Sequence, residues 1–206
     1  GADGAIGGGD DVAVGVTDND ASLEEAIVTY DFGNGASVTV GKMLSYLGFE
    51  AYDPTNMYQF SYAYDNPTYG IVQGIYDAYA TGASVDYGND MFSVGVWTSL
   101  TNSPDLEYAL AFTGVENLTI KAIVADYGKD SVASTGFKGK STYWASYQLG
   151  KLLLAAEIAE TEASTSAGTD LEGMLIMANY GITDKAGITL RYSEFEATTG
   201  STKNFD

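Results

Sequence analysis

The sequence predicts an all-β protein: an antiparallel up-and-down β-barrel that crosses a membrane with strands. Three observations predict this class. Segments of alternating apolar and polar residues recur along the 206-residue chain, short turns alternate with longer polar connections, and no run of about 18 apolar residues marks a transmembrane helix. Alternation is the period of a strand. A chain that crosses lipid without helices has to close its sheet into a barrel.

Composition agrees with a β protein and narrows the partners. The chain has 16 Tyr, 8 Phe and 25 Gly but 3 Pro, and aromatic residues favour strands while glycine serves turns. The formal net charge of −19 argues against nucleic acid and against docking on anionic lipid headgroups. Such an acidic surface or lumen would favour cations. The absence of cysteine excludes a disulfide framework and thiolate metal sites.

Ten strand candidates follow one another as hairpins. The first hairpin joins candidates at 23–32 and 36–44 through Gly33-Asn34-Gly35, a turn that hairpins favour. A long connection at 45–69 follows it. The remaining candidates pair as 70–80 with 85–99, 106–115 with 118–127, 141–149 with 152–161, and 171–182 with 186–195.

The alternation inside each candidate assigns its two faces. Tyr108 and Leu110 share one face, while Glu107 and Ala109 share the other. A basic residue on the lipid face near the membrane midplane costs about 2–4 kcal/mol, so we expect charged strand residues to face the lumen. A soluble β-sandwich would also alternate, but connections that are short on one side and long on the other favour the barrel. The predicted lumen residues are Asp31, Glu107, Lys121, Gln148, Glu157 and Arg191.

One segment resembles a known family. The stretch 40–50 reads Val-Gly-Lys, then Leu-Gly-Phe-Glu, and an aromatic run at 58–64 precedes Pro67 and Gly70. This pattern resembles the β-barrel porin family described as OmpL-like, over about 38–76. The resemblance implies a porin of a Gram-negative bacterial outer membrane, with membrane lipid and small hydrophilic solutes or ions as its partners. It does not carry over the identity of the solute.

The same connection is a candidate constriction. A loop of about 25 residues inside a compact domain is usually functional, and in large porins one long loop folds into the lumen. Acidic loop residues opposite basic wall residues would set up a field across the pore. We expect the loop to contribute Tyr46, Glu50, Tyr52 and Asp53, opposite Lys121 and Arg191. The alternative is an extra strand whose packed face is Tyr58, Phe60, Tyr62 and Tyr64, with Glu50 solvated.

The strand count predicts a larger parent barrel. If the short turns are periplasmic, both ends of 1–206 lie on the external side, whereas bacterial barrels ordinarily begin and end in the periplasm. We therefore expect 1–206 to be one barrel domain from a parent with twelve or more strands. The sequence does not decide whether the protein assembles as a homotrimer.

Catalysis and cofactors have little support in the sequence. The chain has no His and no Cys, which excludes Ser-His-Asp and Cys-His sites and the usual zinc sites. We therefore expect no enzyme and no cofactor. Calcium in a loop stays open at Asp10-Asp11 and Asp18-Asn19-Asp20, although the full spacing of a calcium loop is missing.

The sequence leaves two functions. The first is a cation-preferring passive diffusion channel in the bacterial outer membrane. The second is a non-transport surface protein, either a plugged structural barrel or a soluble acidic β adhesin. Small residues such as Ala109 and Ala111 on the expected lumen face favour open space, whereas Leu153, Leu175 and Met177 favour a filled interior.

Overall fold

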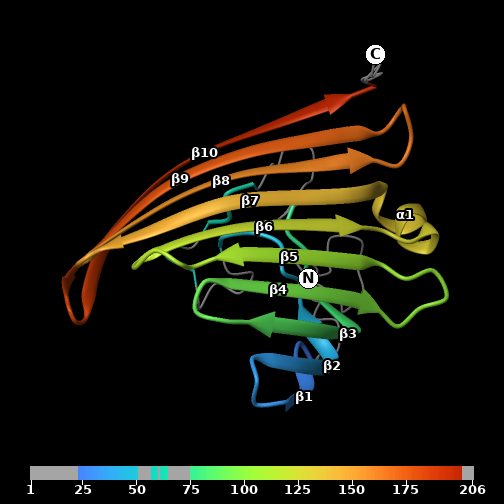
Figure 1. The fold of residues 1–206 in the computed structure, drawn as a ribbon. Helices are drawn as coiled ribbons and strands as arrows, with labels where there is room; N and C mark the ends of the chain where they lie inside the picture. Colours follow the sequence, from blue (N-terminus) through green and yellow to red (C-terminus); the bar gives the residue numbers. More distant parts are fainter. Residues whose placement is uncertain (1–22, 51–56, 60, 65–74, 201–206) are drawn as a thin grey trace, which may run out of the picture.

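The computed structural model describes residues 23–50, 57–59, 61–64 and 75–200. They form one antiparallel sheet of ten strands, and each strand pairs with its neighbours in sequence, from β1 to β10 (Figure 1). The predicted all-β class, the ten strands and the up-and-down order are confirmed. The strands are β1 (Ala26–Asp31), β2 (Ala36–Leu44), β3 (Tyr79–Gly88), β4 (Phe92–Ser99), β5 (Leu106–Phe112), β6 (Leu118–Asp126), β7 (Phe137–Leu149), β8 (Leu152–Ala163), β9 (Thr169–Thr183) and β10 (Ala186–Thr199).

The connections at the two ends of the sheet differ in length. At one end the turns span 32–35, 89–91, 113–117, 150–151 and 184–185, and we call this the short-turn end. The other end, called the loop end, carries the connections 45–78, 100–105, 127–136 and 164–168. The predicted asymmetry therefore rests on 45–78 and 127–136. The second of these contains α1 (Lys129–Thr135), and no helix in the described part of the chain is long and apolar enough to cross a membrane.

The second hairpin corrects the predicted strand boundaries. The sequence placed strands at 70–80 and 85–99 with a turn at 81–84, but β3 runs through that turn and the chain reverses at 89–91. The side chain of Asn89 stabilises the reversal, because its Oδ1 accepts hydrogen bonds from the N–H groups of Met91 (2.8 Å) and Phe92 (2.9 Å). Gly82 lies inside β3, where a Cβ would come within 2.4 Å of Trp97 Nε1. This glycine therefore makes room for a tryptophan and does not make a turn.

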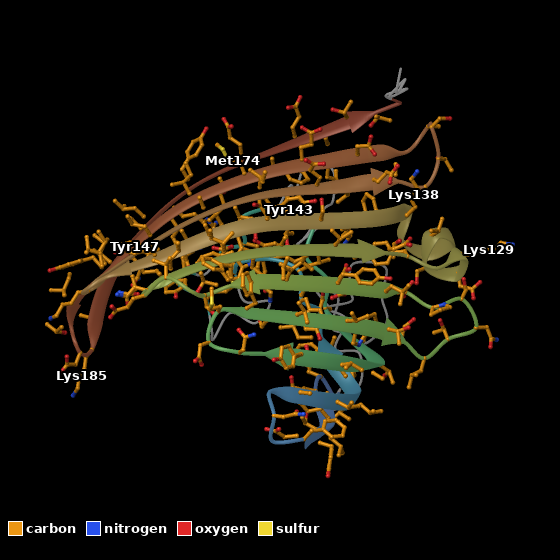
Figure 2. All side chains as sticks on the ribbon, in the orientation of Figure 1. Lys129, Lys138, Tyr143, Tyr147, Met174 and Lys185 are labelled. Atoms are coloured by element: carbon orange, nitrogen blue, oxygen red, sulfur yellow. The ribbon has the colours of Figure 1, made fainter. Side chains whose placement is uncertain are left out.

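One face of the sheet, called the outer face, carries a continuous apolar band. Successive outward residues of β9 are Tyr180, Ala178, Ile176 and Met174. β8 repeats this pattern, and β10 repeats it as far as Tyr192, since Glu194 is the neighbour of Met174. Tyr143, Tyr147 and Met174, labelled in Figure 2, belong to the band. Large apolar side chains that stay exposed across a whole face are typical of contact with lipid.

Aromatic residues border the band at the short-turn end. Phe92 and Phe112 face each other across β4 and β5 with ring centroids 5.2 Å apart. Aromatic girdles at this position are typical of membrane β-barrels, because amphipathic rings suit the membrane–water interface. The outward aromatic residues next to these turns are Tyr30, Tyr87, Phe92, Phe112, Tyr147 and Tyr180.

Carboxylates border the band at the loop end, which corrects one expectation. Glu160, Glu172 and Glu196 are direct cross-strand neighbours on β8, β9 and β10, and all three are exposed on the outer face. The expectation that charged strand residues face the lumen is therefore wrong for these three residues. The physical reason is position along the strand: the carboxylates lie beyond the apolar band, where a charge stays hydrated.

Candidate functional site

The connection between β2 and β3 lies against the face opposite the apolar band. We call this the inner face, and we call the described residues of the connection, 45–50, 57–59, 61–64 and 75–78, the strap. Hydrogen bonds join the strap to β3, β5, β7, β8 and β10. The strap therefore crosses most of the width of the sheet (Figure 1).

The strap begins by crossing β3, β5 and β7. The N–H of Tyr46 donates to Glu107 Oε2 at 2.7 Å, and its hydroxyl donates to Asp86 Oδ1 at 2.6 Å. The N–H of Gly48 then donates to Thr142 Oγ1 at 3.1 Å. Burial, together with the hydrogen bond to Asp86, raises the pKa of Tyr46 above its ordinary value. The phenol therefore stays protonated and acts as a donor.

Glu157 on β8 is the point where three parts of the strap meet. Its Oε2 accepts a hydrogen bond from the N–H of Phe49 at 2.6 Å, and its Oε1 accepts from the hydroxyls of Tyr64, at 2.9 Å, and Tyr76. The Glu157 side chain is among the most deeply buried in the described chain. Burial, and then the charge of Glu157, raises the pKa of both phenols, so both remain donors. A buried carboxylate is tolerated only with such partners.

Arg191 on β10 holds the middle of the strap. Its Nη1 contacts both carboxylate oxygens of Glu50, at 2.8 and 2.9 Å, and the carbonyl of Ser61 at 2.6 Å. Its Nη2 donates to Ser61 Oγ and to the carbonyl of Tyr62, at 2.9 and 3.0 Å. Glu50 also accepts a hydrogen bond from the N–H of Ala63 at 3.1 Å. This arrangement folds the strap on itself and ties it to the wall.

Asp77 and Lys140 form a third attachment, at the end of the strap. Lys140 Nζ lies 2.7 Å from Asp77 Oδ1, and the hydroxyl of Tyr127 donates to the other oxygen of the same carboxylate. Lys140 is an inner-face residue of β7 with its side chain 6% exposed. The strap is therefore fixed to the wall shortly before β3 begins.

Apolar packing fills the space under the strap at β8 and β9. Tyr64, Ile75 and Tyr76 pack with Leu171 and Leu175. Gly173 provides a seat for the ring of Tyr64, since a Cβ there would lie 2.5 Å from its Cε1. This half of the inner face is therefore closed to water.

Lys121 on β6 also lies on the inner face. Unlike Lys140 and Arg191, it forms no ion pair with a described residue of the strap. Its Nζ lies 5.6 Å from the ring centre of Tyr46 and 6.0 Å from that of Trp144, positions suited to cation–π attraction. Among the described residues, no carboxylate lies within ion-pair distance of it, although Asp86 lines the same cavity. That cavity measures about 180 Å³, and small residues such as Gly95 and Ala109 leave room in it.

The short-turn end of the inner face is open and polar. A cavity of about 390 Å³ there is lined by residues that include Thr119, Ser146 and Gln148. The side-chain amide of Gln148 donates to the carbonyl of Gly150 at 2.8 Å. Asp31 belongs to the first turn at the same end, where its Oδ1 accepts a hydrogen bond from the N–H of Gly33 at 2.7 Å. Gln148 and Asp31 therefore support turns at the rim.

Sequence reasoning selected some of these residues and missed others. The structure brings Tyr46, Glu50, Glu107, Lys121, Glu157 and Arg191 to the inner face around the strap, whereas Tyr52 and Asp53 lie outside the described residues. The proposed calcium loops at 10–11 and 18–20 also lie outside them. We expected Glu50 and Arg191 to face each other across the open pore and set up an electric field there. In the structure the two side chains form a direct ion pair, so their charges largely cancel. Asp77, Asp86 and Lys140 were missed. Lys140 lies just before the predicted strand at 141–149, whereas Asp77 and Asp86 lay within the predicted strands at 70–80 and 85–99, where their charge was the available signal.

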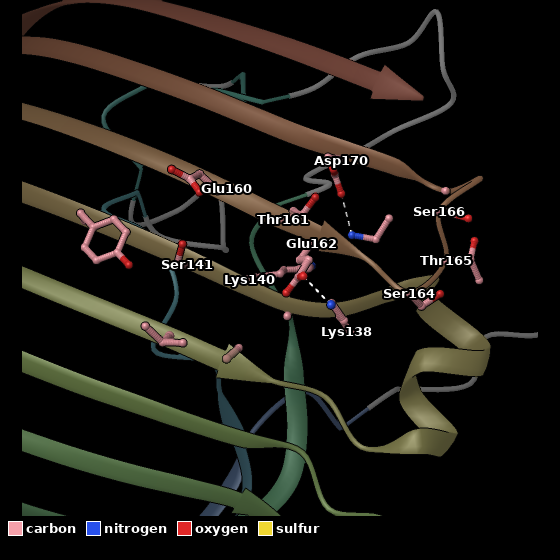
Figure 3. A pocket seen from close by; sticks show the side chains of 16 residues that line it. Lys138, Lys140, Ser141, Glu160, Thr161, Glu162, Ser164, Thr165, Ser166 and Asp170 are labelled. Carbon is pink, nitrogen blue, oxygen red and sulfur yellow. Dashed lines mark hydrogen bonds and ion pairs between the residues drawn. The ribbon is translucent and has the colours of Figure 1, made fainter. Parts of the chain in front are cut away.

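A further groove lies at the loop end of the sheet. It measures about 660 Å³ and is lined by the ends of β7 and β8 and by the connection 164–168 (Figure 3). Lys138 and Glu162 form an exposed ion pair in it, and the N–H of Ala163 donates to Asp170 at 2.7 Å. The lining mixes both charges with hydroxyls.

Comparisons with known proteins give one match. A family model described as phosphate-selective porin O and P matches residues 8–143, which is more than half of the chain. Comparison with curated proteins and with solved structures gave no match.

Proposed function

Because the chain belongs to the phosphate-selective porin O and P family, we propose that it forms a passive diffusion channel for small hydrophilic solutes, with a preference for anions. The family consists of β-barrel outer-membrane porins. The OmpL-like resemblance therefore indicated the right broad class, although the matching model describes a different porin family.

The observation that carries the proposal is the division of one sheet into two unlike faces. The outer face has an apolar band with an aromatic border, and the inner face has polar residues with a strap across it. A barrel wall that faces lipid on one side and water on the other has this pattern. The strap would narrow the passage, and the open polar cavity at the short-turn end would admit water.

The preference for anions replaces the cation preference expected from the net charge of −19. The description of the family does not support a cation-preferring channel. The net charge is also a poor guide to the lumen, because Glu160, Glu172 and Glu196 face outward. On the inner face, Arg191 forms an ion pair with Glu50, and Lys140 forms an ion pair with Asp77. Among the described inner-face cations, Lys121 has no ion-pair partner, although the carboxylates of Glu107 and Asp86 lie near it. Lys121 is therefore the residue that we propose to meet an anion such as inorganic phosphate.

Ion selectivity tests this proposal. In a planar bilayer with a KCl gradient, we expect the wild-type reversal potential to indicate anion preference. Lys121→Gln should move that potential toward cation preference and weaken any block by inorganic phosphate, because charges at a constriction set selectivity. Lys185→Gln is the matched control, since Lys185 lies in the β9–β10 turn (Figure 2). A cation-selective wild-type channel would refute the anion preference, and an unchanged Lys121→Gln channel would refute the role of Lys121.

A second candidate is a plugged barrel without transport. The apolar packing of Tyr64, Ile75 and Tyr76 on β8 and β9 favours it, because it fills part of the interior. Under this alternative a folded, membrane-inserted protein would give no current. The non-enzymatic nature of the chain agrees with a channel family and otherwise stays a prediction.

A further inference from the structure

We propose that Glu157 is the positioning residue that holds the strap across the lumen and thereby limits the size of solute that passes. This inference rests on the proposed channel function, which it deepens by naming the group on which the constriction depends. Glu157 belongs to the wall, yet its three hydrogen-bond partners Phe49, Tyr64 and Tyr76 all belong to the strap.

The three partners of Glu157 are spread along the whole strap. Phe49 lies near the start of the strap, Tyr64 in its middle and Tyr76 near its end. One carboxylate therefore gathers three points of a connection whose ends leave β2 and enter β3, five strands away from β8. Without that carboxylate, three donors in a buried region would lose their acceptor, which is costly for each donor.

The immediate neighbours of Glu157 offer no substitute acceptor. Its cross-strand neighbours are Trp144 on β7 and Leu175 on β9, and neither side chain accepts a hydrogen bond. The Nε1 of Trp144 is itself a buried donor without a partner among the described residues. The attachment therefore depends on Glu157.

Arg191 and Asp77 play a different part. Arg191 fixes Glu50, Ser61 and Tyr62 to β10, and Asp77 fixes the end of the strap to Lys140. Arg191 thus joins two parts of the strap and Lys140 holds one, whereas Glu157 joins three. Loss of Glu157 should therefore loosen the strap as a unit, while these contacts and those of Tyr46 and Gly48 keep the chain near the wall.

The control for this test is Thr161, which lies four residues further along the same strand and on the same inner face. Thr161 is buried, and its Oγ1 accepts a hydrogen bond from the N–H of Leu171 at 2.9 Å. Among the described residues it has no hydrogen bond to the strap. Thr161→Val therefore removes a buried polar group from β8 without touching the proposed anchor.

The first readout is the mobility of the strap itself. The chain has no cysteine, so Tyr58→Cys gives a unique site for a spin label, and Tyr58 is 43% exposed. We expect an immobilised label in the otherwise unaltered protein and with Thr161→Val, and a mobile label with Glu157→Leu. Glu157→Gln keeps one oxygen acceptor, so it should give an intermediate spectrum and serves as the variant least disturbing to folding. A label that stays immobile in both Glu157 variants would overturn the proposal.

The second readout is the pore. With Glu157→Leu in the full chain, we expect the single-channel conductance to rise about two-fold and larger polyethylene glycols to enter, because the narrowest part of a pore limits its passage. Thr161→Val should leave both unchanged. A mobile label with unchanged conductance and polymer exclusion would refute the strap as the size limit while leaving the channel intact. Absence of current from the wild type would refute the channel, and the label would still decide the anchor.

Discussion

Replacing Ile176 by Arg should prevent stable insertion of the protein into a bilayer. Ile176 is 53% exposed on the outer face and lies midway between Tyr180, at the aromatic border, and Glu172, at the acidic border. An arginine on the lipid face near the midplane of a membrane barrel costs about 2–4 kcal/mol. The measurement is the free energy of unfolding from lipid vesicles in a denaturant titration, together with the fraction of protein that inserts.

The control for this substitution lies on the same strand and the same face. Glu172→Arg places the same side chain beyond the apolar band, where it stays hydrated, and it removes the repulsion from Glu160 and Glu196. We expect its insertion and stability to match the wild type. Equal tolerance of arginine at both positions would contradict the assignment of the outer face to lipid.

Replacing Arg191 by Ala should destabilise the strap strongly, because it leaves Glu50 buried without a countercharge. The side chains of Arg191 and Glu50 are 10% and 0% exposed. Breaking a buried ion pair on one side costs about 3–5 kcal/mol. Adding Glu50→Gln to Arg191→Ala should recover part of that loss, since the uncompensated charge is then gone. Denaturant unfolding of both variants measures this difference.

An exposed ion pair in the same protein serves as the reference. The side chains of Lys138 and Glu162 are 52% and 61% exposed, and a surface pair of this kind contributes about 0–1 kcal/mol. Lys138→Ala should therefore change the free energy of unfolding little. Equal losses of unfolding free energy for Lys138→Ala and Arg191→Ala would show that burial does not distinguish these two ion pairs. That result would refute the role of Arg191 in holding the strap.

The sequence predicted the facing of most strands because alternation is a local property. Glu107 and Ala109 fall on the inner face, and Tyr108 and Leu110 on the outer face, as expected. The prediction failed at 70–80, because Ile75 and Tyr76 are apolar for a different reason: they belong to the strap and pack against β9. An apolar pair in a short segment does not reveal whether it belongs to a strand or to a connection that covers one.

The site was predictable only in part, because its contacts join distant segments. Glu50 and Arg191 are 141 residues apart in the sequence. The alternation of residues along the strand placed Arg191 on the lumen side, but it did not reveal which residue Arg191 contacts. The pairing of Asp77 with Lys140 needed correct boundaries for β3 and β7. The three-way role of Glu157 had no local signal, since two of its partners are tyrosine hydroxyls in a connection.

The most direct test of the proposed channel is single-channel recording of the wild-type full-length protein in a planar bilayer. We expect stepwise openings, because in the proposed channel the polar inner face encloses a water-filled passage that the strap narrows without sealing. A protein that is folded and inserted, as shown by a denaturant-resistant band on an unheated gel, but gives no current steps would contradict the channel and favour the plugged barrel.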